Sequence, residues 1–152
     1  MMLKLSDDNL KNIDSVKKLF VTEKTKIKEQ FYYNHRGIKC CKLNSDLTDV
    51  LIKKIFELTN PLKLANQDFL ICAVGGYGRK LLAPYSDIDL LFVYNQKIPE
   101  KELKRTIEQI IYPLWDLGMK VGHAARTFKE VISLSKKEQI IKTSILDARL
   151  IL

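Results

Sequence analysis

The sequence has few of the residues that build cysteine or histidine metal sites. It contains three cysteines and two histidines in 152 residues. Cys40 and Cys41 are adjacent and Cys72 stands alone, so no pair has the Cys-x-x-Cys spacing of a zinc or redox site. Neither His35 nor His123 is followed by aspartate. The sequence therefore predicts reduced, structural thiols and no histidine–aspartate metal site.

Long apolar runs are also missing. No run approaches the roughly 20 residues that a transmembrane helix needs, and the opening letters "MMLKLSDDNLKN" lack the apolar core of a signal peptide. The hydrophobic fraction of 46% and the charged fraction of 29% are typical of a globular protein. These features predict a cytoplasmic protein with a real core and no membrane partner.

Acidic residues are in the minority, with 18 Asp and Glu against 26 Lys and Arg and a formal net charge of +8. Such a charge attracts phosphate-rich partners, including nucleotides and nucleic acids. The lysines are scattered along expected helices, however, and no stripe of basic and aromatic residues indicates a nucleic-acid surface. We therefore expect a mostly solvated basic face and no nucleic-acid partner.

The first part of the chain has the spacing of helices. Apolar residues at loose helical intervals predict a helix over about residues 7–33, which is broken at Gly37. Asn44 or Ser45 is expected to cap a second helix, and Pro61 marks its end.

The rest of the chain alternates between strand and helix patterns. Continuous apolar runs predict buried strands at 69–76 and 87–94, and residues 119–127 read as a third strand. A helix is expected over 99–117, and residues 128–152 are expected to be helical. The predicted fold class is α/β (α+β): a small mixed β-sheet with a helical lead-in and carboxy-terminal helices.

The segment from Gly75 to Leu91, "GGYGRKLLAPYSDIDLL", carries the chemistry. It is not the dinucleotide fingerprint, because Leu81 stands where that pattern needs a third glycine. It is not a P-loop either, because no Gly-Lys pair is followed by Ser or Thr. What remains is a glycine doublet, ten residues and then Asp-x-Asp.

Asp87 and Asp89 are two residues apart, so their side chains project from the same face of a strand. Two carboxylates at that spacing repel each other, and a hard divalent cation relieves the repulsion. The apolar neighbours of Asp89 suggest that it is buried and therefore needs a partner. Both aspartates are thus predicted to be metal ligands and catalytic residues, holding Mg²⁺ (or Mn²⁺).

Glycines at the end of the preceding strand allow backbone N–H groups to approach a phosphate, and Arg79 adds a fixed cation. The residues predicted to bind a nucleotide are Gly75, Gly76, Tyr77, Gly78, Arg79, Ser86 and Arg126.

Several of these side chains have a second interpretation. Tyr77 and Tyr85 stack on a base or pack around the loop, and Ser86 contacts phosphate or turns the chain into the strand.

Two further residues are interpreted from their surroundings. His123 orients a phosphate or is a structural histidine, and Trp115 is expected in the core.

The motif resembles the signature of the DNA polymerase β-like nucleotidyltransferase superfamily. More narrowly, "GGYGR…PYSDIDLL" resembles the amino-terminal domain of bacterial [protein-PII] uridylyltransferases. "LWDLGMKVGHAART" (114–127) and "TSILDARLIL" (143–152) are similar to downstream segments of that family, in the same order. The resemblance implies UTP as the nucleotide donor, a tyrosine of a PII-like signalling protein as the acceptor and release of pyrophosphate.

The sequence departs from the family in two places. Lys80 and Leu81 stand where members usually have glycine and a polar residue. The superfamily often has a third carboxylate on the later strand, which here reads "KVGHAART" and contains none, so Asp116 and Asp147 are only distant candidates.

The resemblance also divides the chain into a helical lead-in, 1–66, and a nucleotidyltransferase core, 67–152. Full-length members continue into an HD hydrolase domain and ACT domains, for which these residues hold no counterpart. We therefore expect a truncated form. It is either a transferase that neither removes the nucleotide nor responds to glutamine, or an inactive remnant that only binds a nucleotide or a partner protein.

Overall fold

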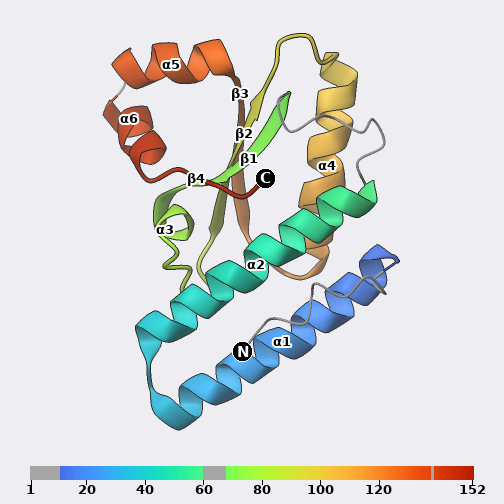
Figure 1. Cartoon of the computed structure of the whole chain (residues 1–152), viewed down its shortest axis with the longest axis vertical. Coiled ribbons are helices and arrows are strands. Elements are labelled where there is room, and N and C mark those ends of the chain that lie inside the picture. Colours follow the sequence, from blue (N-terminus) through green and yellow to red (C-terminus); the bar gives the residue numbers. More distant parts are fainter. Residues whose placement is uncertain (1–10, 60–67, 138) are drawn as a thin grey trace.

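A four-stranded mixed sheet forms the centre of the fold, with helices around it (Figure 1). The computed structural model describes residues 11–59, 68–137 and 139–152. In chain order the elements are α1 (Ile13–Asn34), α2 (Gly37–Thr59), β1 (Phe69–Ala73), α3 (Gly75–Gly78), β2 (Ile88–Tyr94), α4 (Glu100–Asp116), β3 (Val121–Thr127), α5 (Phe128–Lys137), α6 (Gln139–Leu146) and β4 (Arg149–Leu150).

The strand order is β3-β2-β1-β4. β1 pairs antiparallel with β2, from Phe69 opposite Tyr94 to Ala73 opposite Leu90. β2 and β3 run parallel, and α4 makes the crossover that parallel neighbours require. The expected mixed sheet of three strands is therefore confirmed, with β4 added at the edge of β1.

One face of the sheet is apolar and carries the core. Ile71, Leu90 and Phe92 are buried there. The ring of Phe69 stacks between Phe56 of α2 and Phe92 of β2, with ring centroids 5.9 and 5.8 Å apart. Buried residues of α1 and α2 belong to the same cluster as those of the strands, so the lead-in helices and the sheet share one core.

Local signals in the sequence explain where two elements begin and end. Gly118 follows α4 with φ +71, its N–H bonds to the Trp115 carbonyl, and the Met119 N–H bonds to the Leu114 carbonyl. This is a Schellman ending, which favours glycine. α5 begins with a capping box, in which the Thr127 N–H donates to Glu130 at 2.7 Å.

The expected cap of the second helix is wrong. Asn44 and Ser45 lie inside α2 and are buried, because the helix already begins at Gly37. Ser45 satisfies its hydroxyl by donating to the Cys41 carbonyl one turn earlier, at 2.9 Å. The expected helix start at residue 7 and the break at Pro61 lie outside the described residues.

Three other expectations need correction. The run 69–76 ends as a strand at Ala73 and turns into α3. Residues 128–152 are not helical throughout, because β4 pairs with β1. Trp115 is 49% exposed and therefore not in the core. Among the described residues, no helix has both the length and the apolar content needed to cross a membrane.

Candidate active site

The two aspartates of the motif lie on the open face of the sheet. Asp87 comes immediately before β2 and Asp89 is its second residue. Both are exposed, while Ile88 and Leu90 between and after them are buried. Alternation along the strand therefore places both carboxylates on the face opposite the core. The expectation that Asp89 is buried is wrong, although the shared face is as expected.

The glycine turn lies against Asp89. The Val74 N–H donates to the Asp89 carbonyl at 3.0 Å, so the end of β1 is fixed beside the start of β2. Gly75 follows with φ +60, and a Cβ at this position would lie 3.4 Å from the Asp89 carboxylate. The loop that leaves the turn thus brings the Asp89 carboxylate back beside the turn.

Gly122 of β3 makes room for the Asp89 carboxylate. The parallel register places Gly122 beside Asp89, and a Cβ on Gly122 would lie 2.8 Å from Asp89 Oδ1. Real Cβ atoms do not approach an oxygen this closely, so a larger residue would displace the carboxylate. From the sequence we singled out His123 and Arg126 on this strand and the lack of a third carboxylate, but we missed the role of Gly122.

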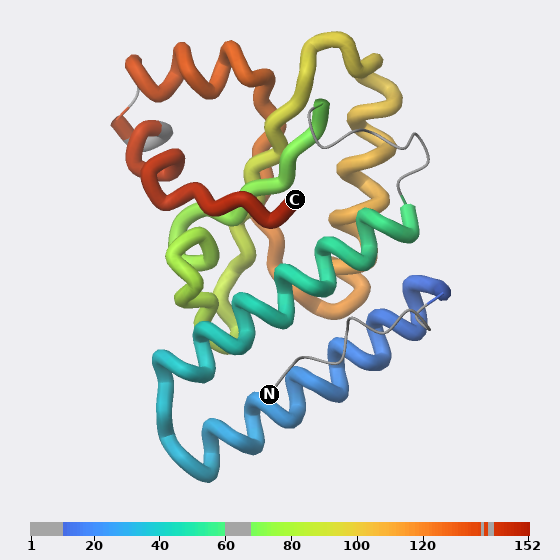
Figure 2. The backbone as a smooth tube through the Cα atoms, viewed as in Figure 1, coloured from blue at the N-terminus to red at the C-terminus, as the bar shows by residue number. Residues whose placement is uncertain are grey.

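Gly78 is required for a different reason. A Cβ there would lie 2.1 Å from the backbone oxygen of Asp147 and 2.9 Å from that of Ala73. The terminal segment leading from α6 into β4 therefore packs directly on the end of α3, as the path of the tube shows (Figure 2).

Arg79 follows the turn and forms an ion pair with Asp147. The pairing fixes the guanidinium near the glycine turn, and it also occupies one of the two distant candidates for a third carboxylate. The other candidate, Asp116, pairs with Lys17 of α1 at 2.7 Å.

The loop side chains divide between packing and exposure. Tyr77 is only 1% exposed, and its hydroxyl donates to Asp49 of α2 at 2.7 Å. The interpretation of its ring as packing is therefore correct, and its ring does not stack on a base. Burial and the neighbouring Asp49 raise the Tyr77 pKa well above its usual value. Tyr85 is exposed, and Ser86 Oγ donates to the Ala83 carbonyl at 3.0 Å, which is the turn role expected for it.

The two candidates on β3 lie on opposite faces of the sheet. Arg126 pairs in register with Val93, on the same face as Asp89 but about 13 Å farther along the strands. His123 pairs with Leu90 and its ring makes an edge contact with buried Phe92 at 6.2 Å. His123 therefore lies on the sheet face that carries the core, but it is exposed there, so its role stays a prediction.

A cavity of about 220 Å³ lies between α1, α2 and the loop before β2. Ser86 and Tyr85 line it, together with Lys24 of α1, but neither aspartate does. The candidate site is thus the open sheet face beside the glycine turn and not this cavity.

The donor set at the aspartates fits a hard divalent cation. Two exposed carboxylates on one face, beside a glycine turn, leave the remaining positions to water and phosphate, as Mg²⁺ prefers. Among the residues described, no group of three or more His, Cys, Asp or Glu is placed to hold a metal. The site therefore offers the two-carboxylate arrangement only.

Comparison with known proteins agrees with this geometry. Residues 52–149 match the nucleotidyltransferase domain family. Three similar proteins are each called "Bifunctional uridylyltransferase/uridylyl-removing enzyme". The one from Caulobacter vibrioides (strain NA1000 / CB15N) is 39% identical over 95% of this chain and 16% of the relative. Those from Phenylobacterium zucineum and Azospirillum brasilense are 42% and 37% identical over 80% and 83% of this chain and 14% of each relative.

The chain thus spans only 14% to 16% of the length of these relatives, about one seventh. The likeness extends over nearly the whole chain, further into the helical lead-in than the motifs alone indicated. The family match covers most of the sequence and includes the glycine turn, both aspartates and β3. The chain therefore belongs to the nucleotidyltransferase domain family.

Proposed function

We propose that this chain transfers a uridylyl group from UTP to a tyrosine hydroxyl of a PII-like signalling protein, in a reaction that needs Mg²⁺ or Mn²⁺. The observation that carries the proposal is the contact between the glycine turn and Asp89, where a Cβ on Gly75 would lie 3.4 Å from the Asp89 carboxylate. Backbone N–H groups at such a turn can bind a phosphate, and carboxylates beside it can hold the cation that the phosphate also contacts.

Each part of the site has a proposed task. Asp87 and Asp89 would hold the cation, which when bound would neutralise charge on the triphosphate and on the transition state. Backbone N–H groups at Gly75 and Gly76 would approach the phosphates, because the first N–H groups of a helix have no partner within it. Arg79, held by Asp147, would add positive charge beside them.

The transfer itself exchanges one phosphorus–oxygen bond for another. The acceptor hydroxyl oxygen bonds to the α-phosphorus, the bond to the β-phosphate oxygen breaks, and pyrophosphate leaves. The hydroxyl proton passes to one of the two aspartates. Both side chains are exposed, so the acceptor protein can bring its tyrosine hydroxyl next to them.

The choice of UTP and of a PII-like acceptor is supported by the names of the relatives and by the resemblance of this chain's own motifs, not by the geometry. The relatives are uridylyltransferases, and the family typically uses a divalent metal and a nucleoside triphosphate. Because the chain spans only 14% to 16% of their length, the acceptor and the base are the parts of the proposal that most need a test.

A second candidate function is nucleotide binding without turnover. It is favoured by the absence of a third acidic ligand near the two aspartates, which holds for residues 11–59, 68–137 and 139–152. Two carboxylates suffice to hold one cation together with a triphosphate. A carboxylate that coordinates the cation is less available to accept the hydroxyl proton, so transfer is hindered when the same two aspartates must do both.

The test is incubation of the chain with each labelled nucleoside triphosphate, Mg²⁺ or Mn²⁺ and a purified PII protein. Transfer of label from UTP to PII, lost in a variant with Asp87→Asn and Asp89→Asn, is the expected result. Metal-dependent binding of UTP without transfer would favour the binding function. Absence of metal-dependent binding for every triphosphate would contradict both.

A further inference from the structure

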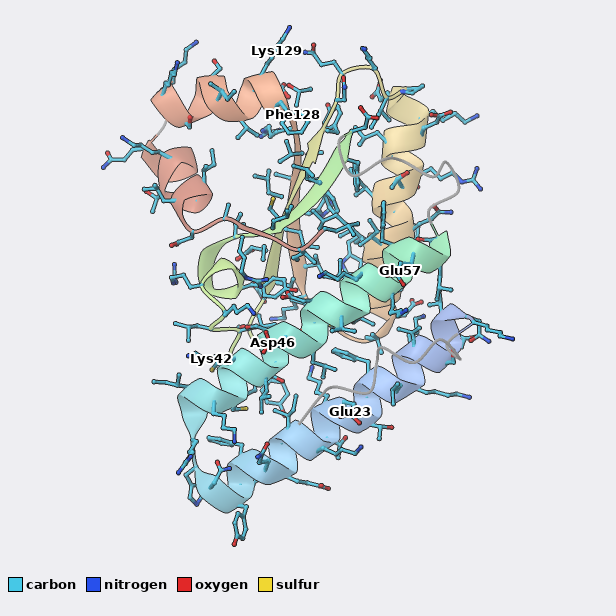
Figure 3. All side chains as sticks on the ribbon, in the orientation of Figure 1. Glu23, Lys42, Asp46, Glu57, Phe128 and Lys129 are labelled. Atoms are coloured by element: carbon cyan, nitrogen blue, oxygen red, sulfur yellow. The ribbon has the colours of Figure 1, made fainter. Side chains whose placement is uncertain are left out.

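One side of α2 holds residues 77–82, which are the end of the glycine turn and the segment that follows it. Three of its side chains, within two turns of helix, accept hydrogen bonds from this segment; Figure 3 labels the middle one, Asp46. The contacts are Leu82 N–H to Ser45 Oγ at 3.1 Å, Lys80 Nζ to Asp46 at 2.8 Å and the Tyr77 hydroxyl to Asp49 at 2.7 Å.

Arg149 of β4 completes the arrangement from the other end of the chain. Its guanidinium donates to both oxygens of Asp49, at 2.6 and 3.0 Å, which is the two-pronged geometry specific to arginine. It also donates to the backbone carbonyls of Tyr77 at 3.3 Å and Gly78 at 3.2 Å. The guanidinium lies over the Tyr77 ring, 5.5 Å from its centroid.

These bonds fix the glycine turn at its far end. The carbonyls that Arg149 holds belong to the last two residues of α3, while the first residue of α3, Gly75, lies against Asp89. The whole of α3 is only four residues long, so the held end and the end beside the carboxylate are close neighbours. A shift at one end therefore moves the other, because so short a turn has too few backbone torsions to absorb the shift.

We propose that Asp49 and Arg149 are positioning residues, which hold the glycine turn in the shape that receives the triphosphate. This inference rests on the proposed function of the turn. Neither residue touches the open face where Asp87 and Asp89 lie, so the pair acts through the backbone of α3.

The energetics of the pair favour positioning over simple stabilisation. The Asp49 and Arg149 side chains are only 14% and 23% exposed, so pairing them costs desolvation that offsets much of their attraction. A buried ion pair is therefore weak evidence of stability but defines a geometry. Burial lowers the pKa of Arg149, but the hydrogen bonds to Asp49 and the charge of Asp49 together raise this pKa by more. The Arg149 guanidinium therefore stays charged.

Asp49 also lies outside the stretch that matches the family, which begins at residue 52. The family match alone thus assigns it no part in the site.

The experiment compares Arg149→Lys and Tyr77→Phe with the wild type. Arg149→Lys keeps the charge and loses the two-pronged bonds; Tyr77→Phe keeps the ring and loses the bond to Asp49. The matched control is Lys17→Gln, which removes a 2.7 Å ion pair between α1 and α4 and does not touch α3. Two quantities are measured: hydrogen exchange of the backbone amides that close the turn, and Mg²⁺-dependent UTP affinity.

The closing amides are those of Gly78, Arg79 and Leu81, bonded to Val74, Gly75 and Gly76 at 3.0, 3.1 and 2.9 Å. We expect their exchange to accelerate at least about tenfold in Arg149→Lys and less in Tyr77→Phe. We also expect UTP affinity to fall about tenfold in Arg149→Lys, with β1 and β2 protected as in the wild type. Lys17→Gln should change neither quantity.

Each outcome separates this inference from the proposed function. Unchanged exchange at the turn in Arg149→Lys would overturn the inference, as would faster exchange with unchanged UTP affinity. If the variant loses protection in every strand, Tyr77→Phe decides by the same two readouts, since it removes a single hydrogen bond. Faster exchange at the turn in Arg149→Lys, together with no UTP binding even by the wild type, would support the hold of Asp49 and Arg149 on the turn and contradict the proposed function.

Discussion

Replacing Gly122 by alanine should damage the site while leaving the fold intact. The new Cβ would lie 2.8 Å from Asp89 Oδ1, too close for both atoms to remain. The neighbour that must move is the end of a side chain and not backbone, so the Asp89 carboxylate rotates away and the sheet stays as it is.

The change in stability is expected to be small because two effects oppose each other. Glycine inside a strand is less favourable than alanine by roughly 0.5–1 kcal/mol, which the substitution recovers. Forcing Asp89 away from its preferred rotamer costs about 0.5–1.5 kcal/mol. The free energy of unfolding should thus stay within about 1 kcal/mol of the wild type. Metal-dependent UTP affinity should fall about 10–100-fold, which is the usual loss when a residue that orients a metal ligand is changed.

The assay is urea unfolding together with calorimetric titration of UTP in the presence of Mg²⁺. Gly37→Ala is the control, because a Cβ there has open space and the residue is the first of α2. It should bind UTP like the wild type. Wild-type affinity in a folded Gly122→Ala would refute the assignment of Asp89 as a ligand. A loss of several kcal/mol in the free energy of unfolding would refute the expectation that the Asp89 carboxylate can move aside without disturbing the sheet.

Three further predictions concern other parts of the fold. Gly78→Ala would place a Cβ 2.1 Å from the Asp147 backbone oxygen, so we expect a loss of about 3 kcal/mol in urea unfolding; a loss below 0.5 kcal/mol would contradict the close packing. Hydrogen bonds from the Thr127 N–H and hydroxyl lower the Glu130 pKa, so this stabilisation is complete above about pH 4.3 and disappears as the pH falls through the folded value. The protection of α5 amides, measured relative to their intrinsic exchange rates, should therefore fall at low pH in the wild type and be low at every pH in Glu130→Ala, which removes the accepting oxygens; identical pH profiles would refute the cap. Burial raises the pKa of the Cys72 thiol, so its alkylation at pH 7.5 should be at least about tenfold slower in the folded chain than in urea, and equal rates would show that the thiol is accessible.

The parts of the fold that follow from local pattern were predictable. β2 lies within the expected range 87–94, because a buried strand is a continuous apolar run. β3 lies within the expected range 119–127, although most of its residues are partly or fully exposed. The end of α4 was predictable as well, since Gly118 provides the positive φ that its Schellman ending needs.

The expectations that proved wrong concern features that depend on contacts between residues distant in the sequence. β4 has only two residues and becomes a strand because β1 offers it an edge, which its own sequence does not show. Ser45 resembles a helix cap by type, yet inside α2 its hydroxyl accepts from the Leu82 N–H, 37 residues away. No local rule distinguishes these cases.

The same division applies to the site. The approach of the glycine turn to Asp89 follows from a hairpin-like return of the chain and was expected from spacing. The pairing of Asp49 with Arg149 joins residues 100 positions apart and left no signal in the sequence. Gly122 could have been found by placing β2 and β3 in parallel register, which puts a glycine beside the second aspartate.

The central claim is that Asp87 and Asp89 hold the cation that accompanies a triphosphate at the glycine turn. The most direct test is thermal unfolding with and without Mg²⁺ and UTP, in the wild type and in a variant with Asp87→Asn and Asp89→Asn. At a UTP concentration of about 100 times Kd, binding stabilises by about 2.7 kcal/mol, which raises the Tm by roughly 5–11 °C in a chain of this size. We predict this rise in the wild type only, with the unliganded variant as stable as the wild type or more so, because repulsion between the two carboxylates is removed. An equal rise in both proteins would contradict the claim.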